Sequence, residues 1–202
     1  MNHPAPPPPG NRERLLLAAR ELFLEQGYDA SVDAIIGRAG VARQTFYNHF
    51  QNKESLFVEA VRCCVADVIA PLHVNPGKVR DSLFAFALGY RKRALSAEGV
   101  AIYRTLISQA QRFPELIREL SGQGDGQMIG SLAAFLRQAM HDGQLRRADD
   151  VLAAELLLAM LLGQERNQRL LGVERPVLDE QTLVGQVIDG FLRMYAPERR
   201  TS

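Results

Sequence analysis

Apolar residues recur at helical spacing along nearly the whole chain beyond residue 10. The first segment carries Leu15, Ala19, Leu22 and Phe23 at this spacing, and Gly27 follows where the pattern ends. Residues three and four apart share one face of an α-helix, and glycine commonly ends a helix. Runs of alternating β-branched residues bounded by Asn-Gly or Asp-Gly, which mark β-hairpins, never appear. The sequence therefore predicts an all-α fold.

Glycine, proline and capping residues between the apolar periods set the expected helix bounds. Residues 1–10 are proline-rich and are expected to form a disordered tail, and HVNPGK (73–78) is the expected joint between two domains or two layers of helices. We expect a small domain at 11–57, a larger helical domain at 58–202, and a short turn beginning at Pro114. The expected helices are 12–26, 32–38, 42–49, 52–70, 79–95, 99–112, 126–142, 150–171 and 179–196.

Composition limits the classes of protein that the chain can be. Its 202 residues are 47% hydrophobic, which is enough for a buried core, and 24 Lys and Arg face 23 Asp and Glu, so any basic binding surface has to be local. Cys63 and Cys64 form neither a disulfide framework nor a metal-binding pair, and we expect no metal and no cofactor. No signal peptide and no apolar run of membrane-spanning length is recognised, which favours a cytoplasmic protein.

The stretch RAGVARQTFYNHFQNKESLF, from Arg38 to Phe57, joins two short expected helices through a turn that contains Gly40. Glycine adopts a positive φ angle at no steric cost, which suits such a turn. The second helix is polar, while Phe46 and Phe50 keep a core close by. Two helices joined in this way have the layout of a helix-turn-helix, whose second helix enters the major groove of DNA.

The N-terminal turn of the polar helix carries side chains that match the edges of bases. Arg43 can bond guanine O6 and N7, Gln44 can bond adenine N6 and N7, and Thr45 can meet a thymine methyl group. Hydroxyl and imidazole groups farther along suit phosphate oxygens, and Lys53 opens the next helix, where its ammonium and free backbone N–H groups can share a phosphate. The expected contacts to double-stranded DNA are Ser31, Ala42, Arg43, Gln44, Thr45, Tyr47, Asn48, His49 and Lys53.

A solvated helix face is the simpler interpretation of this polar cluster. Residues 11–60 hold six basic and seven acidic side chains, so the segment has no positive excess to supply non-specific affinity for DNA. A DNA-binding surface in this segment therefore has to be one face on which the groups that bind DNA lie together, with the acidic side chains elsewhere.

Residues from about 11 to 56 resemble the DNA-binding domain of the TetR family of bacterial transcriptional regulators. The resemblance rests on ARELF, GY, AGV, TFYNHF and KESLF at their intervals in this chain. It implies an all-helical homodimer in the bacterial cytoplasm, with a DNA operator and a ligand-responsive C-terminal domain. The chain departs from the family at Ala42, where a capping serine is frequent, and at Ile36, where alanine is usual. The missing cap costs its helix about 1 kcal/mol.

The segments SQAQRFPELIREL and FLRQAMHDGQLRRADDVLAAELLLAMLLG are similar to the C-terminal domain of the AefR-like branch of that family. In the family, the last two helices pack against their copies as a four-helix bundle; packing within one chain is the simpler interpretation of their apolar residues. A two-fold dimer would place its recognition helices about 34–36 Å apart on a near-palindromic operator. The expected interface residues are Leu156, Met160, Gly163, Leu183, Val187 and Phe191.

Aromatic and methionine residues on the middle helices are candidates for an effector pocket. Such residues at helical spacing more often form core than pocket. A cavity with few polar anchors would suit a small apolar or aromatic effector. The expected lining is Phe86, Tyr90, Tyr103, Ile107, Phe135, Met160 and Gln164.

Together these features favour a ligand-responsive repressor that binds its operator as a homodimer. An activator stays open, as does a dimeric carrier of hydrophobic ligands that does not read DNA. An enzyme is disfavoured, because no GxxxxGK[ST], HExxH or GxSxG motif appears and the four histidines lie on unrelated segments. The recognition helix and the residue that opens the next helix distinguish the regulator from the carrier. The side chains concerned, which serve no obvious purpose in a carrier, are Arg43, Gln44, Tyr47 and Lys53.

Overall fold

The computed structural model describes residues 9–74, 78–111, 114, 126–173 and 179–197, and within these ranges every regular element is a helix. The all-α fold expected from the sequence is therefore confirmed. The elements are α1 (Asn11–Gln26), the 3-10 turn η1 (Gly27–Asp29), α2 (Val32–Ala39), α3 (Arg43–His49), α4 (Lys53–Ile69), α5 (Pro71–Val74), α6 (Val79–Ala94), α7 (Ala97–Gln109), α9 (Gly126–His141), α10 (Asp150–Leu162), α11 (Glu165–Leu170) and α12 (Glu180–Met194).

Two of the expected helices differ from those observed. The helix expected at 150–171 is divided into α10 and α11 by Gly163, whose φ of 47° lies in the left-handed region that other residues rarely adopt. The helix expected from residue 99 begins two residues earlier, because Ser96 caps it and accepts a 3.0 Å hydrogen bond from the Gly99 amide. Most of the turn expected after Pro114 lies outside the described residues.

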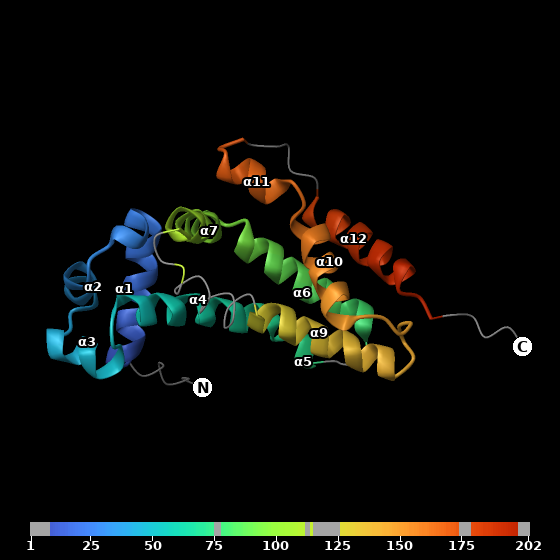
Figure 1. The fold of residues 1–202 in the computed structure, drawn as a ribbon, viewed down its shortest axis with the longest axis horizontal. Helices are drawn as coiled ribbons and strands as arrows, with labels where there is room; N and C mark the ends of the chain where they lie inside the picture. Colours follow the sequence, from blue (N-terminus) through green and yellow to red (C-terminus); the bar gives the residue numbers. More distant parts are fainter. Residues whose placement is uncertain (1–8, 75–77, 112–113, 115–125, 174–178, 198–202) are drawn as a thin grey trace, which may run out of the picture.

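The first four helices and the later helices form two hydrophobic clusters (Figure 1). We call α1, η1, α2 and α3 the head. The core of the head closes with the first turns of α4, and its largest buried side chains are Phe46, Phe57, Leu15 and Ile35. The second cluster lies among α6, α9, α10 and α12, with the side chains of Leu83, Phe86, Leu132, Leu136, Leu157, Leu161 and Phe191 fully buried.

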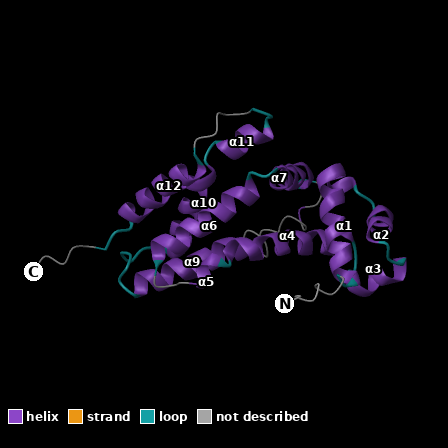
Figure 2. Cartoon of the chain, turned by 180° about the vertical axis from the view of Figure 1, so that it is seen from behind, coloured by secondary structure: helices purple, strands orange, loops and turns teal. Residues whose placement is uncertain are grey.

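Helix α4 belongs to both clusters, so no joint separates them at this point. Leu56 and Ala60 pack in the cluster of the head, and Val68 and Ile69 pack in the second cluster. The boundary expected at 57/58 therefore falls inside one continuous helix. Leu72 before HVNPGK and Val79 after it pack in the same second cluster; residues 75–77 of that segment lie outside the described ranges. Figure 2 shows α4 running from the head alongside α9.

A second connection between the head and the larger part runs through α7, which packs against α1 and η1. Arg20 of α1 forms an ion pair with Glu98 in the first turn of α7, with Nε and Oε1 3.2 Å apart. Near the other end of α1, a Cβ atom on Gly27 would lie 3.5 Å from the Thr105 hydroxyl. Among the described helices, none combines the length and the hydropathy needed to cross a membrane.

Candidate nucleic-acid interface

The turn between α2 and α3 is set by three local features. Ser31 caps α2, with its hydroxyl oxygen accepting a 3.1 Å hydrogen bond from the Ala34 amide. Gly40 ends α2 with a φ of 62° and a ψ of 41°, as the sequence predicted for this position. Ala42 occupies the capping position of α3 and provides no side-chain cap. The two helices thus form the helix-turn-helix that the sequence predicted.

Helix α3 has one buried face and one exposed polar face. Phe46 is fully buried and Phe50 is 5% exposed, and their ring centroids lie 6.0 Å apart in the core of the head. Residues four positions apart share one face of a helix, so Arg43 lies beside Tyr47 and Gln44 beside Asn48, and all four are exposed. We call this exposed set the α3 polar face; it comprises Arg43, Gln44, Tyr47 and Asn48. An aromatic base holds a polar surface in a fixed position.

The α3 polar face makes hydrogen bonds to its own neighbours. Arg43 Nη1 donates to Asp33 Oδ1 at 2.7 Å, and the Arg43 guanidinium lies 6.0 Å from the centroid of the Tyr47 ring. Gln44 Nε2 donates to Asn48 Oδ1 at 3.1 Å. The side chains of Arg43 and Asp33 are 63% and 71% exposed, and ion pairs in such surroundings are weak. These bonds can therefore be exchanged for bonds to a nucleic acid.

Lys53 lies at the edge of this surface but is tied to the head. Its Nζ donates to the Tyr28 carbonyl oxygen at 2.7 Å and lies 4.2 Å from the centroid of the Tyr28 ring. The Tyr28 hydroxyl donates in turn to Glu54 at 2.9 Å, and burial together with this bond raises the pKa of Tyr28. An ammonium has three N–H donors, so the bond to Tyr28 leaves donors for a phosphate. The phosphate contact of Lys53 stays a prediction.

The remaining expected DNA contacts lie around the α3 polar face. His49 is exposed at the end of α3, and Thr45 is half-buried between the two faces of the helix. Ser31 is exposed although its hydroxyl caps α2, and Ala42 is exposed beside the turn. The structure thus brings the nine expected residues to one end of the molecule, while their contacts with DNA stay predictions.

Arg14 supports the turn of the helix-turn-helix, a role that the sequence did not indicate. Its Nη2 donates to the Gly40 carbonyl oxygen at 2.8 Å, so α1 is bonded directly to the turn. The other basic side chains near the turn face acids: Arg38 bonds Glu21 and Glu25 of α1, and Arg12 bonds Glu59. Only a contact map identifies such a role, because Arg14 and Gly40 are 26 positions apart.

The residues expected to line an effector pocket occupy two environments. Phe86 is fully buried and stacks on Tyr90, with centroids 5.9 Å apart, and Phe135 is 8% exposed in the same core. Phe86 thus packs in the core of this structure, and its place in an effector pocket stays a prediction. Tyr103 is half-buried under the Arg166 guanidinium, 4.0 Å from the ring centroid. The three others, Ile107, Met160 and Gln164, are exposed.

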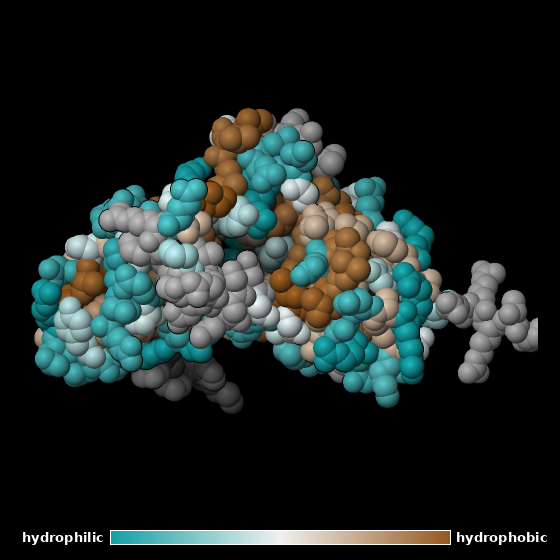
Figure 3. All heavy atoms as spheres, viewed as in Figure 1, coloured by the Kyte–Doolittle hydropathy of each residue, from teal (hydrophilic) through white to brown (hydrophobic). Residues whose placement is uncertain are grey.

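The residues expected at a dimer interface also divide. Leu156 and Met160 are each 38% exposed, and with Val151 and Leu152 they form an apolar patch over α10 that Figure 3 shows. Gly163 is exposed at the end of α10, and Leu183 and Val187 are half-buried on α12. Phe191 is fully buried with its ring centroid 4.7 Å from that of Tyr195. Phe191 therefore packs in the core of its own chain, and the dimer interface itself stays a prediction.

Comparisons with known proteins agree with this geometry. Residues 15–60 match the family model of bacterial regulatory proteins of the tetR family. Residues 81–197 match the model of the C-terminal domain of AefR-like transcriptional repressors. The second match alone spans more than half of the 202 residues.

Similar proteins of known name or structure are also found. TcmR, an HTH-type transcriptional regulator of Streptomyces glaucescens, is 31% identical over 133 residues, which are 62% of this chain and 58% of TcmR. A TetR-family regulator from Mesorhizobium loti superposes with a TM-score of 0.79 at 25% identity, over 92% of this chain and 96% of that one. The flavonoid-responsive regulator FrrA superposes with a TM-score of 0.71 at 28% identity, over 93% and 98%. The chain thus belongs to the TetR family of bacterial transcriptional regulators.

Proposed function

We propose that the protein is a cytoplasmic repressor that binds a near-palindromic operator as a homodimer and releases it when a small apolar or aromatic effector binds. The observation that carries this proposal is the α3 polar face, held on the aromatic base of Phe46 and Phe50 beside the Gly40 turn. Its exposed cation, amides and phenol are the groups that recognise base edges and phosphates. The name of the matching C-terminal family model favours repression over activation.

Within this proposal, some residues in and around the α3 polar face contact base edges and others contact phosphates. Arg43 and Gln44 stand in the first turn of α3, the part of a recognition helix that contacts base edges. On DNA, Arg43 gives up its hydrogen bond to Asp33 and bonds guanine instead, and Gln44 gives up its bond to Asn48 and bonds adenine. Both hydrogen bonds are exposed, so they can be replaced. Tyr47, His49 and Lys53 contact phosphates and fix the orientation of the helix.

The apolar patch on α10 supports the proposed homodimer. Val151, Leu152, Leu156 and Met160 of α10 are between 38% and 52% exposed, and Figure 3 shows apolar surface over this helix. Exposed apolar patches of this kind mark interaction sites. A two-fold axis through this patch would pair α10 with its copy and present two heads to one side of a DNA duplex.

The proposal is tested by selecting bound sequences from random duplexes at about physiological ionic strength, where weak non-specific contacts are screened. We expect an inverted repeat to be enriched by the natural chain and lost with Arg43→Ala. Arg62→Ala is the matched control, because Arg62 is also an exposed arginine in an ion pair but lies on α4, away from the α3 polar face. A folded dimer that enriches no sequence would contradict the proposal and favour the ligand carrier.

A further inference from the structure

A cavity of about 350 Å³ lies where the C-terminal end of α6 meets the start of α7, the end of α11 and the start of α12. Leu88 and Leu95 form its apolar side, and Ser96 lies at the junction of α6 and α7. Three cationic side chains and the carboxylate of Glu180 complete the lining. We call it the Arg91 pocket. Its volume falls within the range of cavities that hold small molecules.

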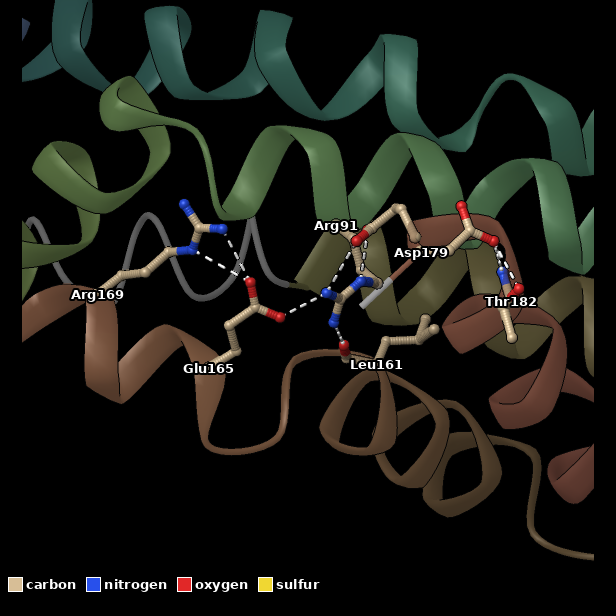
Figure 4. A network of polar contacts seen from close by, with 7 residues as sticks. Arg91, Leu161, Glu165, Arg169, Asp179 and Thr182 are labelled. Carbon is tan, nitrogen blue, oxygen red and sulfur yellow. Dashed lines mark hydrogen bonds and ion pairs between the residues drawn. The ribbon is translucent and has the colours of Figure 1, made fainter. Parts of the chain in front are cut away.

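Arg91 is the unusual member of this lining, because its guanidinium is buried. The residue is 2% exposed, and it donates to Glu180 at 2.6 and 3.2 Å, to Glu165 at 2.5 Å and to the Leu161 carbonyl oxygen. Figure 4 shows its guanidinium pointing at Glu165 and Leu161, with Arg169 of α11 reaching the other oxygen of Glu165. A buried cation held on four helices is costly unless its partners are well placed.

The described charges around the pocket leave one cation in excess. Arg91, Lys92 and Arg169 are positive, whereas Glu165 and Glu180 are negative. Both oxygens of Glu165 bond arginines, so the charge of this carboxylate is already paired. Lys92 is exposed and forms an ion pair with none of the described acids. Glu180 is 41% exposed at its side chain, and it is therefore the partner of Arg91 that a ligand can replace most easily.

We propose that the Arg91 pocket binds a hydrophobic monocarboxylate. The ligand carboxylate takes the place of the Glu180 carboxylate on Arg91 and pairs with Lys92, while its apolar body lies along Leu88 and Leu95. Arginine suits this task because its planar donors match the two oxygens of a carboxylate. This proposal deepens the proposed function by assigning the effector a charged group and a place between helices.

The Arg91 pocket is also connected to the head, through the junction of α6 and α7. The Ser96 hydroxyl donates to the Arg93 carbonyl oxygen at 2.8 Å, and Arg93 bonds Glu98 at 2.8 and 2.9 Å. Glu98 bonds Arg20 of the head at 3.2 Å. A ligand against Leu95 and Ser96 therefore acts within one helical turn of the contact that holds α7 to α1. Binding there changes the position of the head, and operator affinity and ligand affinity change by the same factor.

The binding step is tested by calorimetric titration of the full chain with octanoate and with 3-phenylpropanoate, using 1-octanol as the uncharged control. We expect both carboxylates to bind and octanol to bind at least tenfold more weakly, because one lost charged hydrogen bond is worth about tenfold or more. Lys92→Leu should weaken octanoate binding about tenfold for the same reason. Glu180→Gln should strengthen it, because the competing carboxylate is gone. A role of Glu180 in folding alone would not produce that gain.

Arg137→Leu on α9 is the matched control, because it removes an exposed arginine from an ion pair with Asp150 and does not line the pocket. We expect it to bind octanoate as the natural chain does. Circular dichroism shows that each variant is folded before titration. No binding of either carboxylate, equal binding of octanol, or a loss of affinity in Glu180→Gln would each overturn the proposal.

The regulatory step has its own measurement. Octanoate is added to the complex of the protein with its selected operator, and we expect release that weakens in Lys92→Leu. Titration without DNA keeps this result distinct from the proposed function: binding of octanoate by a chain that selects no operator supports the pocket and contradicts the repressor. An operator complex unaffected by bound octanoate supports the repressor and overturns the regulatory role of the pocket.

Discussion

Arg43 of the head and Arg91 of the larger part are the same residue type in opposite surroundings. The side chain of Arg43 is 63% exposed and bonds one exposed carboxylate, whereas that of Arg91 is 3% exposed and bonds two carboxylates and a carbonyl oxygen. An exposed cation can exchange its partner for a base at little cost, whereas a buried one holds its neighbours together. The head therefore presents its polar groups on the surface, whereas in the larger part the polar groups around Arg91 lie inside the fold.

The two parts of the molecule are also held rigid by different interactions. In the head the rigid part is the aromatic base under α3, which remains in place whatever the α3 polar face contacts. Around Arg91 the polar bonds themselves join α6, α10, α11 and α12. A ligand that alters those bonds alters the arrangement of helices, which is the property that a sensor needs.

The largest effect on stability is expected for Arg91→Met. Removing this guanidinium leaves Glu165 and Glu180 without their common partner; breaking a buried ion pair costs about 3–5 kcal/mol, and because these carboxylates are 27% and 41% exposed we expect the low end of that range. Urea unfolding followed by circular dichroism measures the loss. Arg43→Met is the control, and its unfolding midpoint should match that of the natural chain. Equal unfolding midpoints for the two variants would contradict the conclusion that Arg91 stabilises the fold and Arg43 does not.

A smaller loss is expected for Gly99→Ala at the junction of α6 and α7. A Cβ atom at this position would lie 2.2 Å from the Arg93 carbonyl oxygen, so the two helices would have to separate. Overpacking of this kind costs about 1–3 kcal/mol. Gly89→Ala in α6 is the control, because nothing lies within 4 Å of its Cβ and alanine favours a helix by about 1 kcal/mol. The two glycines should therefore shift the unfolding midpoint in opposite directions.

Most of the fold could be predicted from the sequence because its signals are local. The apolar spacing of α1, the cap at Ser31 and the left-handed Gly40 each depend on a few neighbouring residues. The division of α10 from α11 was missed because Gly163 was expected to be an interior residue of one helix, although residues 164–169 after it are all polar. The expected domain boundary falls inside α4, which packs in both clusters, and a sequence does not show which core a helical turn joins.

The two candidate sites differ in how far the sequence could locate them. The α3 polar face lies within six consecutive residues, so its composition could be taken directly from the sequence. The Arg91 pocket joins residues from α6, α11 and α12 that stand up to 92 positions apart, and no periodicity links them. Aromatic and methionine residues of the middle helices were expected to line an effector pocket, and of these Phe86 and Phe135 are buried in the core, while none lines the Arg91 pocket. Apolar spacing identifies buried faces but does not tell packed core from empty space.

A gain in stability of about 1 kcal/mol is expected for Ala42→Ser at the start of α3. The backbone of Ala42, with φ −74° and ψ 152°, matches that of the capping residue Ser31, with φ −80° and ψ 154°. A serine hydroxyl can therefore accept from an amide in the first turn of α3, as Ser31 does from Ala34; the equivalent amide of Thr45 now donates to the Ala42 carbonyl oxygen at 2.9 Å. Ser31→Ala should lose about the same amount. A midpoint of urea unfolding that falls in Ala42→Ser would show that the turn cannot accept the cap.

The smallest effect on stability and a large effect on binding are expected together for Gln44→Ala. Its amide bonds only Asn48 among the described residues, and both side chains are exposed, so unfolding should change by less than about 0.5 kcal/mol. Loss of a bidentate contact to adenine should weaken binding to the selected operator about 5- to 150-fold. Operators altered at that base should then bind the variant and the natural chain alike, which fluorescence anisotropy measures. Uniform weakening on all operators would instead place Gln44 on a phosphate, because contacts to the backbone carry no sequence information.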